Sequence, residues 1–379
     1  MLKILILCAA NPATNPRPQR LITLLKDTHK LTALGINASA IRGVEVFSYP
    51  AFHKRNIFEE IRLYKNVFSQ NWQQLIYTPN RLQIAQILTQ HSFDLIICCD
   101  LVLLPIALAY KKGAKILFDA REFYPAQNKS NLRWRLLFAR FNDYLCKTYL
   151  PLADRIITVS KGLQTMYQTQ YGISCELFYS LPKYHNITPS HPKADKIKII
   201  YHGGANPSRK IEHCIELAAY LQDRFELDLM LVHTDKNYQR FLEKSIAQMR
   251  SQGKKINLLP PVPFEEIIPF TAAYDLGLYM IPPSNANLKH ALPNKFFEYI
   301  QARLGLIIAP NPEMIPFVQS YQNGYIAKDF DPKTIAKAIN ALSYEEIISY
   351  KQRSHIAAKT LNMQTNKNNI NALIKALFP

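Results

Sequence analysis

Short apolar runs alternate with longer amphipathic stretches along almost the whole chain. Apolar runs of strand length occur at Lys3–Cys8, Leu31–Leu34, Val44–Ser48, Asp94–Cys99, Lys115–Phe118, Arg155–Val159, Ile197–Tyr201, Leu227–Val232, Ile256–Leu259, Leu276–Met280, Gly305–Ala309 and Gly324–Ala327. Apolar residues recur at helical spacing over Arg20–Asp27, Ile57–Ser69, Arg81–Gln90, Leu101–Lys111, Leu132–Tyr149, Lys161–Tyr171, Ile211–Leu221, Tyr238–Ser251, Phe264–Ala273, Pro293–Arg303, Pro332–Leu342 and Thr365–Leu377. The pattern predicts strands that alternate with helices.

Such an alternation is typical of parallel βαβ units. It is interrupted at Ser180–Asp195, a segment rich in proline, histidine and polar residues that we interpret as a linker. The predicted fold class is therefore α/β, with two doubly wound, Rossmann-like domains facing across a cleft. We expect an N-terminal domain over 1–182 and a C-terminal domain over 183–362, with a terminal helix at about 363–379 packing back on the first domain. Ligands of such sheets bind outside the carboxyl ends of the strands, which favours an active site in the cleft.

The charge of the chain is strongly basic and unevenly distributed. The 379 residues carry a net charge of +18, and 48% of them are hydrophobic, which argues against intrinsic disorder. Residues 1–190 hold 23 Lys and Arg against 11 Asp and Glu, and residues 191–379 hold 23 against 17. The excess of +12 in the first half and +6 in the second indicates a polyanionic partner: nucleic acid, an acidic membrane surface or a phosphorylated substrate.

The N-terminus and the cysteines indicate a cytoplasmic protein. The apolar run that opens the chain is short and ends in Asn11-Pro12, so it reads as a buried strand rather than a signal peptide. No window of 18 uninterrupted apolar residues predicts a membrane-spanning helix. The six cysteines have no CxxC spacing and lie mostly in apolar runs, which predicts buried free thiols in a reducing compartment.

Several common catalytic and cofactor motifs are absent from the sequence. There is no GxGxxG dinucleotide fingerprint, no GxxxxGK[ST] loop and no GxSxG elbow. There is also no HExxH or comparable spacing of zinc ligands, so no metal site is predicted. The adjacent glycines Gly203 and Gly204 are the only such pair.

The segment from His290 to Pro310 holds the most informative pattern. Pro293 suits the first turn of a helix, on which Lys295 and Glu298 share a face because they lie three residues apart. A carboxylate at this place can accept both hydroxyl protons of a ribose. The helix N-terminus and Lys295 suit phosphate oxygens. The alternative is that both are ordinary surface residues.

With this helix, the sequence resembles bacterial glycosyltransferases of the two-domain GT-B fold, especially the retaining family 4 group. Members carry a Pro-Asn-x-x-x-Glu helix whose glutamate holds the donor ribose, and Glu298 takes that place. The family usually has a second glutamate eight positions earlier, where this chain has His290, which we place near the donor. The block from Tyr201 through Gly203 and Gly204 to Arg209-Lys210 resembles the loop that grips the donor diphosphate.

The basic residues of this loop leave two alternatives. The resemblance implies that Arg209 binds the diphosphate, and Lys210 takes its place if the loop register shifts by one residue. Gly203 and Gly204 either form a tight exit from a strand or allow a phosphate to approach the backbone closely.

The first half continues the resemblance in the expected order. Asp119-Ala120-Arg121-Glu122 resembles the Asp-x-His-Glu strand end of the family, with Arg121 in place of the histidine. The segment Ala153–Ser160 matches an Ala-Asp-x-Ile-x-x-Val-Ser strand, and Asn15–Arg17 resembles the loop after the first strand. The resemblance favours Asp119 or Glu122 as the group that orients or deprotonates the acceptor hydroxyl. Either residue could instead cap the following helix.

A basic, aromatic stretch over residues 129–147 has two interpretations. Its basic residues are Lys129, Arg133, Arg135, Arg140 and Lys147, against the single acid Asp143. Such a helix is typical of proteins that bind a membrane surface. Alternatively, its apolar residues pack on the sheet of the same domain and only its basic residues face outward.

Taken together, these features predict a hexosyl- or N-acetylhexosaminyltransferase that uses a nucleotide-diphosphate sugar, with UDP favoured. The resemblance implies retention of configuration, no metal, no cofactor beyond the donor, and a bacterial envelope glycan or lipid-linked acceptor. The expected partners are the donor, the acceptor and an anionic membrane surface, without nucleic acid, and the expected location is the inner face of the cytoplasmic membrane. The alternatives are a nucleotide-sugar epimerase and a non-catalytic, membrane-associated sugar-nucleotide binding protein.

Overall fold

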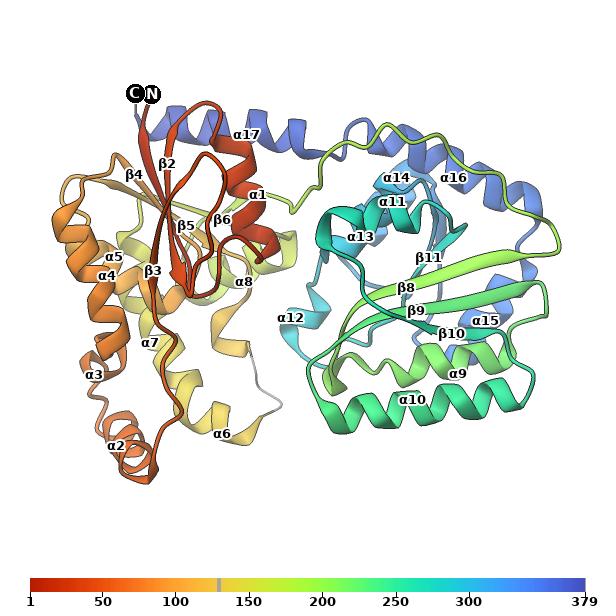
Figure 1. The fold of residues 1–379 in the computed structure, drawn as a ribbon, viewed down its shortest axis with the longest axis horizontal. Coiled ribbons are helices and arrows are strands. Elements are labelled where there is room, and N and C mark those ends of the chain that lie inside the picture. The colour runs from red at the N-terminus through yellow and green to blue at the C-terminus, as the bar shows by residue number, and fades with distance from the viewer. Residues whose placement is uncertain (128–130, 379) are drawn as a thin grey trace. The chain divides into compact units, whose positions relative to one another are not determined.

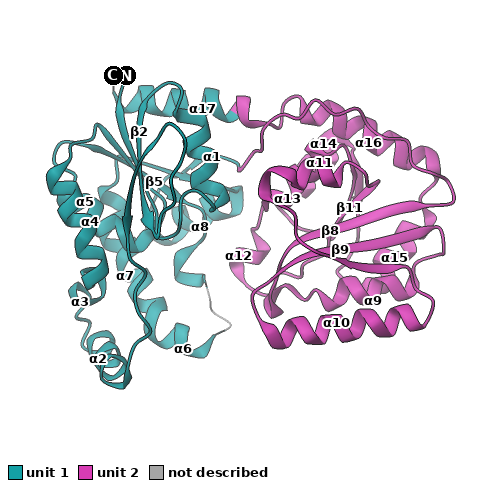
Figure 2. Ribbon diagram, viewed as in Figure 1, with its two compact units in different colours: residues 1–179, 366–379 teal, residues 180–365 magenta. Residues whose placement is uncertain are grey.

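The computed structural model describes residues 1–127 and 131–378 and divides into two compact units. Unit 1 comprises residues 1–179 and 366–379, and unit 2 comprises residues 180–365, as Figure 2 shows. The predicted boundaries after residues 182 and 362 lie close to those of the units.

Unit 1 is built on a parallel sheet of seven strands. Their bounds are β1 Lys3–Leu7, β2 Lys30–Ile36, β3 Glu45–Tyr49, β4 Leu95–Cys98, β5 Lys115–Ala120, β6 Arg155–Thr158 and β7 Glu176–Leu177. The spatial order is β3-β2-β1-β4-β5-β6-β7, so the winding reverses between β1 and β4. The strands β1, β4, β5 and β6 are buried on both faces after their first residues, which is why they read as continuous apolar runs in the sequence.

Helices cover both faces of this sheet, with α4, α5 and α7 on one face and α1 on the other (Figure 1). Their bounds are α1 Pro16–Leu25, α2 Ile57–Phe68, α3 Gln73–Ile76, α4 Pro79–Gln90, α5 Leu104–Tyr110, α6 Leu132–Trp134, α7 Arg140–Tyr149, α8 Lys161–Tyr171 and α17 Met363–Leu377. A π-helical turn, Arg135–Ala139, joins α6 to α7. From Asn366 onward α17 belongs to unit 1, where the Asn366 amide donates a hydrogen bond of 2.7 Å to the carbonyl of Tyr179.

Unit 2 repeats the architecture with a parallel sheet of six strands. Their bounds are β8 Ile197–Ala205, β9 Phe225–His233, β10 Ile256–Leu259, β11 Leu276–Tyr279, β12 Gly305–Ile308 and β13 Gly324–Ile326. The order is β10-β9-β8-β11-β12-β13, so here the winding reverses between β8 and β11. Each sheet therefore has its own switch point, where doubly wound folds bind ligands.

The helices of unit 2 also form two layers. Their bounds are α9 Glu212–Tyr220, α10 Lys236–Ser251, α11 Ile267–Thr271, α12 Ala286–Lys289, α13 Asn294–Gln301, α14 Ile315–Tyr321, α15 Pro332–Ala341 and α16 Tyr344–Ala358. Figure 1 shows α9, α10 and α15 on one face of the sheet and α11, α13, α14 and α16 on the other.

This architecture confirms the predicted fold class of two doubly wound α/β domains. All six cysteines are buried free thiols, as predicted. In the described part of the chain, no helix is both long and apolar enough to cross a bilayer.

The basic stretch over residues 129–147 agrees in part with each of its two interpretations. Its apolar residues Leu137, Phe141 and Leu145 are buried in unit 1, whereas Leu132 and Leu136 are exposed. Lys129 lies outside the described residues.

Candidate functional site at the end of strand β8

The carboxyl end of β8 lies beside the switch point of unit 2. Strand β8 pairs with β9 along its whole length, from Ile197 to Ala205, but with β11 only at Ile199 and Ile200. Beyond Ile200 the edge of β8 that faces β11 is therefore not covered by strand pairing. A crevice at this position is where an open α/β sheet places its ligand.

The two glycines at this end of β8 make room for two cations. Gly203 has a φ of +132°, and a Cβ atom there would lie 2.9 Å from Lys295 Nζ. A Cβ atom on Gly204 would lie 3.2 Å from Arg209 Nη1, which donates a hydrogen bond of 3.0 Å to the Gly204 carbonyl. From the sequence, the missing side chains of these glycines were expected to let a phosphate approach the backbone. In the structure, the same space also accommodates the side chains of Lys295 and Arg209.

Lys295 is a buried cation held over an aromatic ring. It lies in the first turn of α13 and is only 5% exposed, with Nζ 3.7 Å from the ring centroid of Tyr201 and 5.9 Å from that of Tyr279. Its Nζ has no hydrogen-bond acceptor among residues 1–127 and 131–378. Burial, together with the nearby Arg209, lowers the pKa of Lys295 well below its ordinary value of 10.5. A desolvated ammonium group beside a guanidinium group is a binding site for an anion.

Glu298 lies about one turn after Lys295 on the same helix. It is buried, and its Oε2 is 3.7 Å from Nε2 of His202, the residue before Gly203. Burial, with a further contribution from Lys295, lowers the pKa of His202 to about 3, so its ring is neutral at physiological pH. A ligand that reaches both residues of α13 can place a phosphate at Lys295 and a hydroxyl group at Glu298.

The structure adds residues that the sequence analysis left out of the site. Tyr201 and His202 precede the double glycine in β8, and Tyr279 ends β11. Tyr201 and His202 belong to the block that resembles the diphosphate loop, but neither was predicted as a site residue, and Tyr279 was interpreted only as part of a buried strand. The available signal was that all three stand at or near the carboxyl end of a parallel strand, which leads into the ligand-binding edge.

Lys210, predicted to bind the donor, and His290, a catalytic candidate predicted to lie near the donor, each lie close to an acidic residue. Lys210 ends the 3-10 turn Pro207–Arg209 in a left-handed conformation with a φ of 52°, and its Nζ lies 3.6 Å from Glu212. His290 follows α12, and its Nδ1 lies 2.9 Å from Glu313. Arg209, rather than Lys210, is therefore the basic residue that the loop directs toward Gly204.

This difference between neighbours gives a direct test. We expect Arg209→Ala to weaken UDP binding about 10- to 100-fold, since a hydrogen bond to a charged group contributes about 1.5–3 kcal/mol. Lys210→Ala, which removes the same charge one residue later, should change the affinity less than about threefold. Isothermal titration calorimetry with UDP measures both, and the reverse ranking would assign the phosphate contact to Lys210.

In unit 1 the structure does not support a contact between Asp119 and the acceptor. Asp119 is fully buried at the end of β5, and both of its oxygens accept hydrogen bonds of 2.8 Å from Arg17. Arg17 also donates to the carbonyl of Phe178 at 3.0 Å. Asp119 therefore closes a buried ion pair between α1 and β5, a structural role that the sequence analysis did not consider.

Further polar groups at this sheet edge belong to the neighbouring residues Asp100, Arg121 and Glu122. Asp100 follows β4 and accepts hydrogen bonds of 2.7 Å from Arg121 and 2.6 Å from the backbone N–H of Ala9, just after β1. Burial raises the pKa of Asp100, while Arg121 opposes this shift. Asp100 thus bridges the strands at which the winding of unit 1 reverses. Arg121 and Glu122 are both partly exposed beside it.

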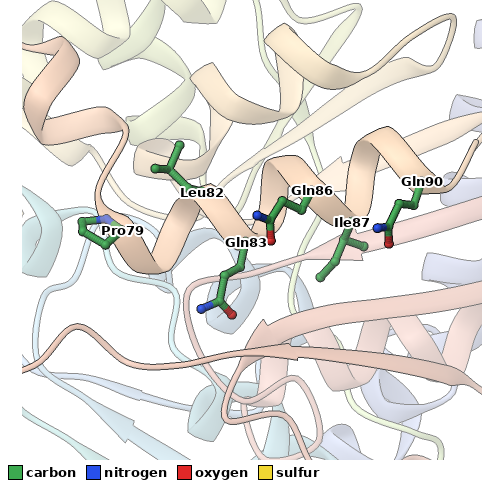
Figure 3. A pocket seen from close by; sticks show the side chains of 6 residues that line it. All are labelled: Pro79, Leu82, Gln83, Gln86, Ile87 and Gln90. Carbon is green, nitrogen blue, oxygen red and sulfur yellow. The ribbon is translucent and has the colours of Figure 1, made fainter.

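A separate hollow of about 510 Å³ lies along α4 (Figure 3). It is lined by Pro79, Leu82, Gln83, Gln86, Ile87 and Gln90. It has no charged lining group and none of the predicted site residues, so it does not fit a diphosphate. In the described residues, no cluster of three or more His, Cys, Asp or Glu side chains is arranged to hold a metal ion.

Comparison with known proteins connects these features to a family. Residues 34–179 match the sequence model of Glycosyltransferase Family 4. The chain carries a glycosyltransferase domain. This matched glycosyltransferase segment ends where unit 1 passes into unit 2 and includes Asp100, Asp119 and Glu122. A search of curated proteins finds no match to the chain.

Solved structures of glycosyltransferases share the fold of the whole chain. HepE from Anabaena, solved with UDP and glucose, matches with a TM-score of 0.74 and 13% identity, covering 99% of this chain and 100% of that one. Sucrose-phosphate synthase from Thermosynechococcus elongatus matches with a TM-score of 0.75 and 12% identity over 100% and 99% of the chains. WaaG, a glycosyltransferase involved in lipopolysaccharide biosynthesis, matches with a TM-score of 0.69 and 11% identity over 98% and 99%. The two doubly wound units of this glycosyltransferase therefore form a GT-B fold.

Proposed function

We propose that the protein transfers a sugar from a UDP-sugar to a glycan or lipid-linked acceptor of the bacterial envelope, with retention of configuration. The observation that carries the donor half is the pair of cations at the end of β8. Lys295 Nζ is buried without an acceptor from any residue that the structure describes, and Arg209 lies beside it, so the site gains most from a ligand with two adjacent negative charges. A diphosphate has this charge, and its sugar-nucleotide esters carry the ribose that suits Glu298.

The same cations favour the chemical step. In the transfer, the bond between the sugar C1 and the diphosphate oxygen breaks, and its electron pair stays on UDP. The acceptor oxygen forms the new bond to C1 and loses its proton. Arg209 and Lys295 would stabilise the charge that develops on the leaving diphosphate, a task that a metal ion performs in other enzymes. We therefore expect activity to persist in the presence of EDTA.

Two further observations support UDP and an acceptor held by unit 1. The structurally similar HepE was solved with UDP-glucose, which supports UDP as the nucleotide. On unit 1, Arg121 and Glu122 place partly exposed charges beside the buried Asp100 at the carboxyl ends of β4 and β5. We assign the binding of the acceptor hydroxyl to this edge, with Glu122 as the candidate base. An acceptor from envelope synthesis would place the enzyme at the inner face of the cytoplasmic membrane.

The ribose assignment is tested by Glu298→Ala. Loss of a charged hydrogen-bonding partner should weaken the binding of UDP about 10- to 100-fold. The matched control is Glu216→Ala, which removes an exposed glutamate from α9 of the same unit and should leave the affinity unchanged. Calorimetry measures both variants, with circular dichroism to show that each is folded. Wild-type affinity in Glu298→Ala would contradict the assignment.

The activity itself is tested by incubation of the purified enzyme with radiolabelled UDP-sugars. Label that appears in a lipid-linked or glycan acceptor, with release of UDP, supports the transferase. Isomerised UDP-sugar in the absence of any acceptor would instead identify an epimerase. Tight binding of UDP-sugars without transfer to any acceptor tested would favour a binding protein.

A further inference from the structure

Helix α2 of unit 1 exposes an apolar face to the surroundings. Ile57, Phe58, Ile61 and Phe68 are between 60% and 77% exposed, although exposed apolar side chains of this size normally occur singly. Ile57, Ile61, Tyr64 and Phe68 recur every three or four residues and so lie on one face of the helix. The helix is anchored to unit 1 by its opposite side, where Leu63 and Val67 are buried.

A second exposed apolar segment adjoins this face. Leu132 and Leu136 are 61% and 51% exposed, and Arg133 between them forms an ion pair of 2.5 Å with Glu60 of α2. The two segments are therefore neighbours on unit 1, and Figure 1 shows α2 and α6 at the same end of the unit. We call them together the α2–α6 surface, made of Ile57, Phe58, Ile61, Tyr64, Phe68, Leu132 and Leu136.

The charges around the α2–α6 surface are almost all basic. Residues 54–68 and 131–140 contain the seven basic residues Lys54, Arg55, Arg62, Lys65, Arg133, Arg135 and Arg140. The same residues contain only two acids, and both are engaged within unit 1. Glu59 accepts a hydrogen bond from the backbone N–H of Asn56 and lies 2.7 Å from His53, and Glu60 pairs with Arg133. An apolar stripe flanked by cations is the pattern of a helix that lies in the surface of an anionic bilayer.

The topology places this surface at the functional end of unit 1. The chain reaches α2 from the carboxyl end of β3, and it reaches α6 from the carboxyl end of β5. Both strands are parallel to β4, so the α2–α6 surface lies at the same end of the sheet as Asp100 and Arg121. A membrane bound there would present its lipids to that edge.

We propose that the α2–α6 surface docks unit 1 on an anionic bilayer, with its apolar residues inserted at the level of the headgroups and its basic residues on anionic lipid phosphates. The proposed membrane contact depends only on the residues of the α2–α6 surface. Delivery of a lipid-linked acceptor to the edge at Asp100 rests on the proposed function. A protein partner would not require the surplus of cations around the stripe, which is why the bilayer is the favoured occupant.

Vesicle co-sedimentation with the full chain tests the proposal. We expect binding to vesicles of phosphatidylglycerol and phosphatidylethanolamine, weaker binding to phosphatidylcholine vesicles, and release as salt is raised. The double variant Phe58→Asp/Ile61→Asp should reduce binding about tenfold or more, since charged groups oppose insertion. The matched control is Phe241→Asp/Ile356→Asp, which replaces two exposed apolar residues of unit 2 and should bind like the wild type.

The outcomes separate this proposal from its rivals and from the proposed function. Wild-type vesicle binding by Phe58→Asp/Ile61→Asp, or no binding by the wild type, overturns the proposal. Self-association of the wild type without vesicle binding, abolished by the same variant, would assign the surface to a second copy of the chain. The affinity for UDP, measured by calorimetry on the same samples, should stay at the wild-type value. If the wild-type protein itself did not bind UDP, this result would count against the proposed function and leave the membrane result unaffected.

Discussion

Replacing Lys295 by methionine is expected to weaken UDP binding severely while it stabilises the free protein. Lys295 supplies the buried positive charge next to Gly203, so its loss should weaken binding by about 100-fold or more. Methionine fills a similar volume beside the Tyr201 ring and removes a charge that burial makes unfavourable. A gain of about 1 kcal/mol would raise the melting temperature of a unit of this size by about 2–4 °C.

The pH dependence follows from the lowered pKa of Lys295. In the unfolded chain the Lys295 amine has its ordinary pKa of 10.5. Because this pKa is lower in the folded state, protonation of Lys295 favours the unfolded state and reduces the free energy of unfolding. This destabilisation disappears only as the pH rises toward 10.5. A bound diphosphate raises the pKa of Lys295 again. Binding should therefore take up protons, and the affinity should fall as the pH rises through the pKa of the free site.

Two measurements check this account. Calorimetry in buffers of different ionisation enthalpy should show proton uptake by the wild type and none by Lys295→Met. Lys289→Met, at the end of α12, is the control and should change neither the affinity nor the melting temperature by much. A variant Lys295→Met that binds UDP normally, or that melts at a lower temperature than the wild type, would show that the buried charge serves the fold rather than the ligand.

The fold was predictable because parallel strands buried on both faces leave a clear signal. The bounds of β10 and α8 agree with the predicted ranges, and β1 and β4 differ from theirs by no more than one residue at each end. Helix α16 was missed although Ser343 and Glu346 form a capping box, a local signal that was present in the sequence. Strand β7 has two residues and gives no periodic signal.

The donor site was less accessible to sequence reasoning, because its parts interact through space. The spacing of Lys295 and Glu298 on one helix could be predicted, but the contact of Lys295 with Tyr201 joins residues on α13 and β8. The same limit explains why Asp119 was predicted to act on the acceptor. A carboxylate at a strand end resembles a catalytic group in sequence, and only its hydrogen bonds to Arg17, 102 residues away in the chain, reveal an internal ion pair.

Asp119→Ala is consequently expected to unfold the protein rather than to disable its chemistry. The substitution leaves the Arg17 guanidinium buried without its counter-ion, which typically costs about 3–5 kcal/mol. This would be a large part of the stability of unit 1, since a domain is usually stable by about 5–15 kcal/mol. Thermal and urea denaturation measure the loss. The fraction that remains folded at low temperature should bind UDP with the wild-type affinity.

A double variant distinguishes this structural role from a catalytic one. In Arg17→Met/Asp119→Leu both charges are replaced by apolar groups, so most of the lost stability should return, because no unpaired charge stays buried. If Asp119 only supports the fold, the rescued variant should also regain transfer activity. If Asp119 contacts the acceptor, the double variant should be stable and inactive. Transfer assays at a temperature where the double variant and the wild type are both folded decide between these outcomes. At that temperature a difference in activity does not reflect a difference in the free energy of unfolding.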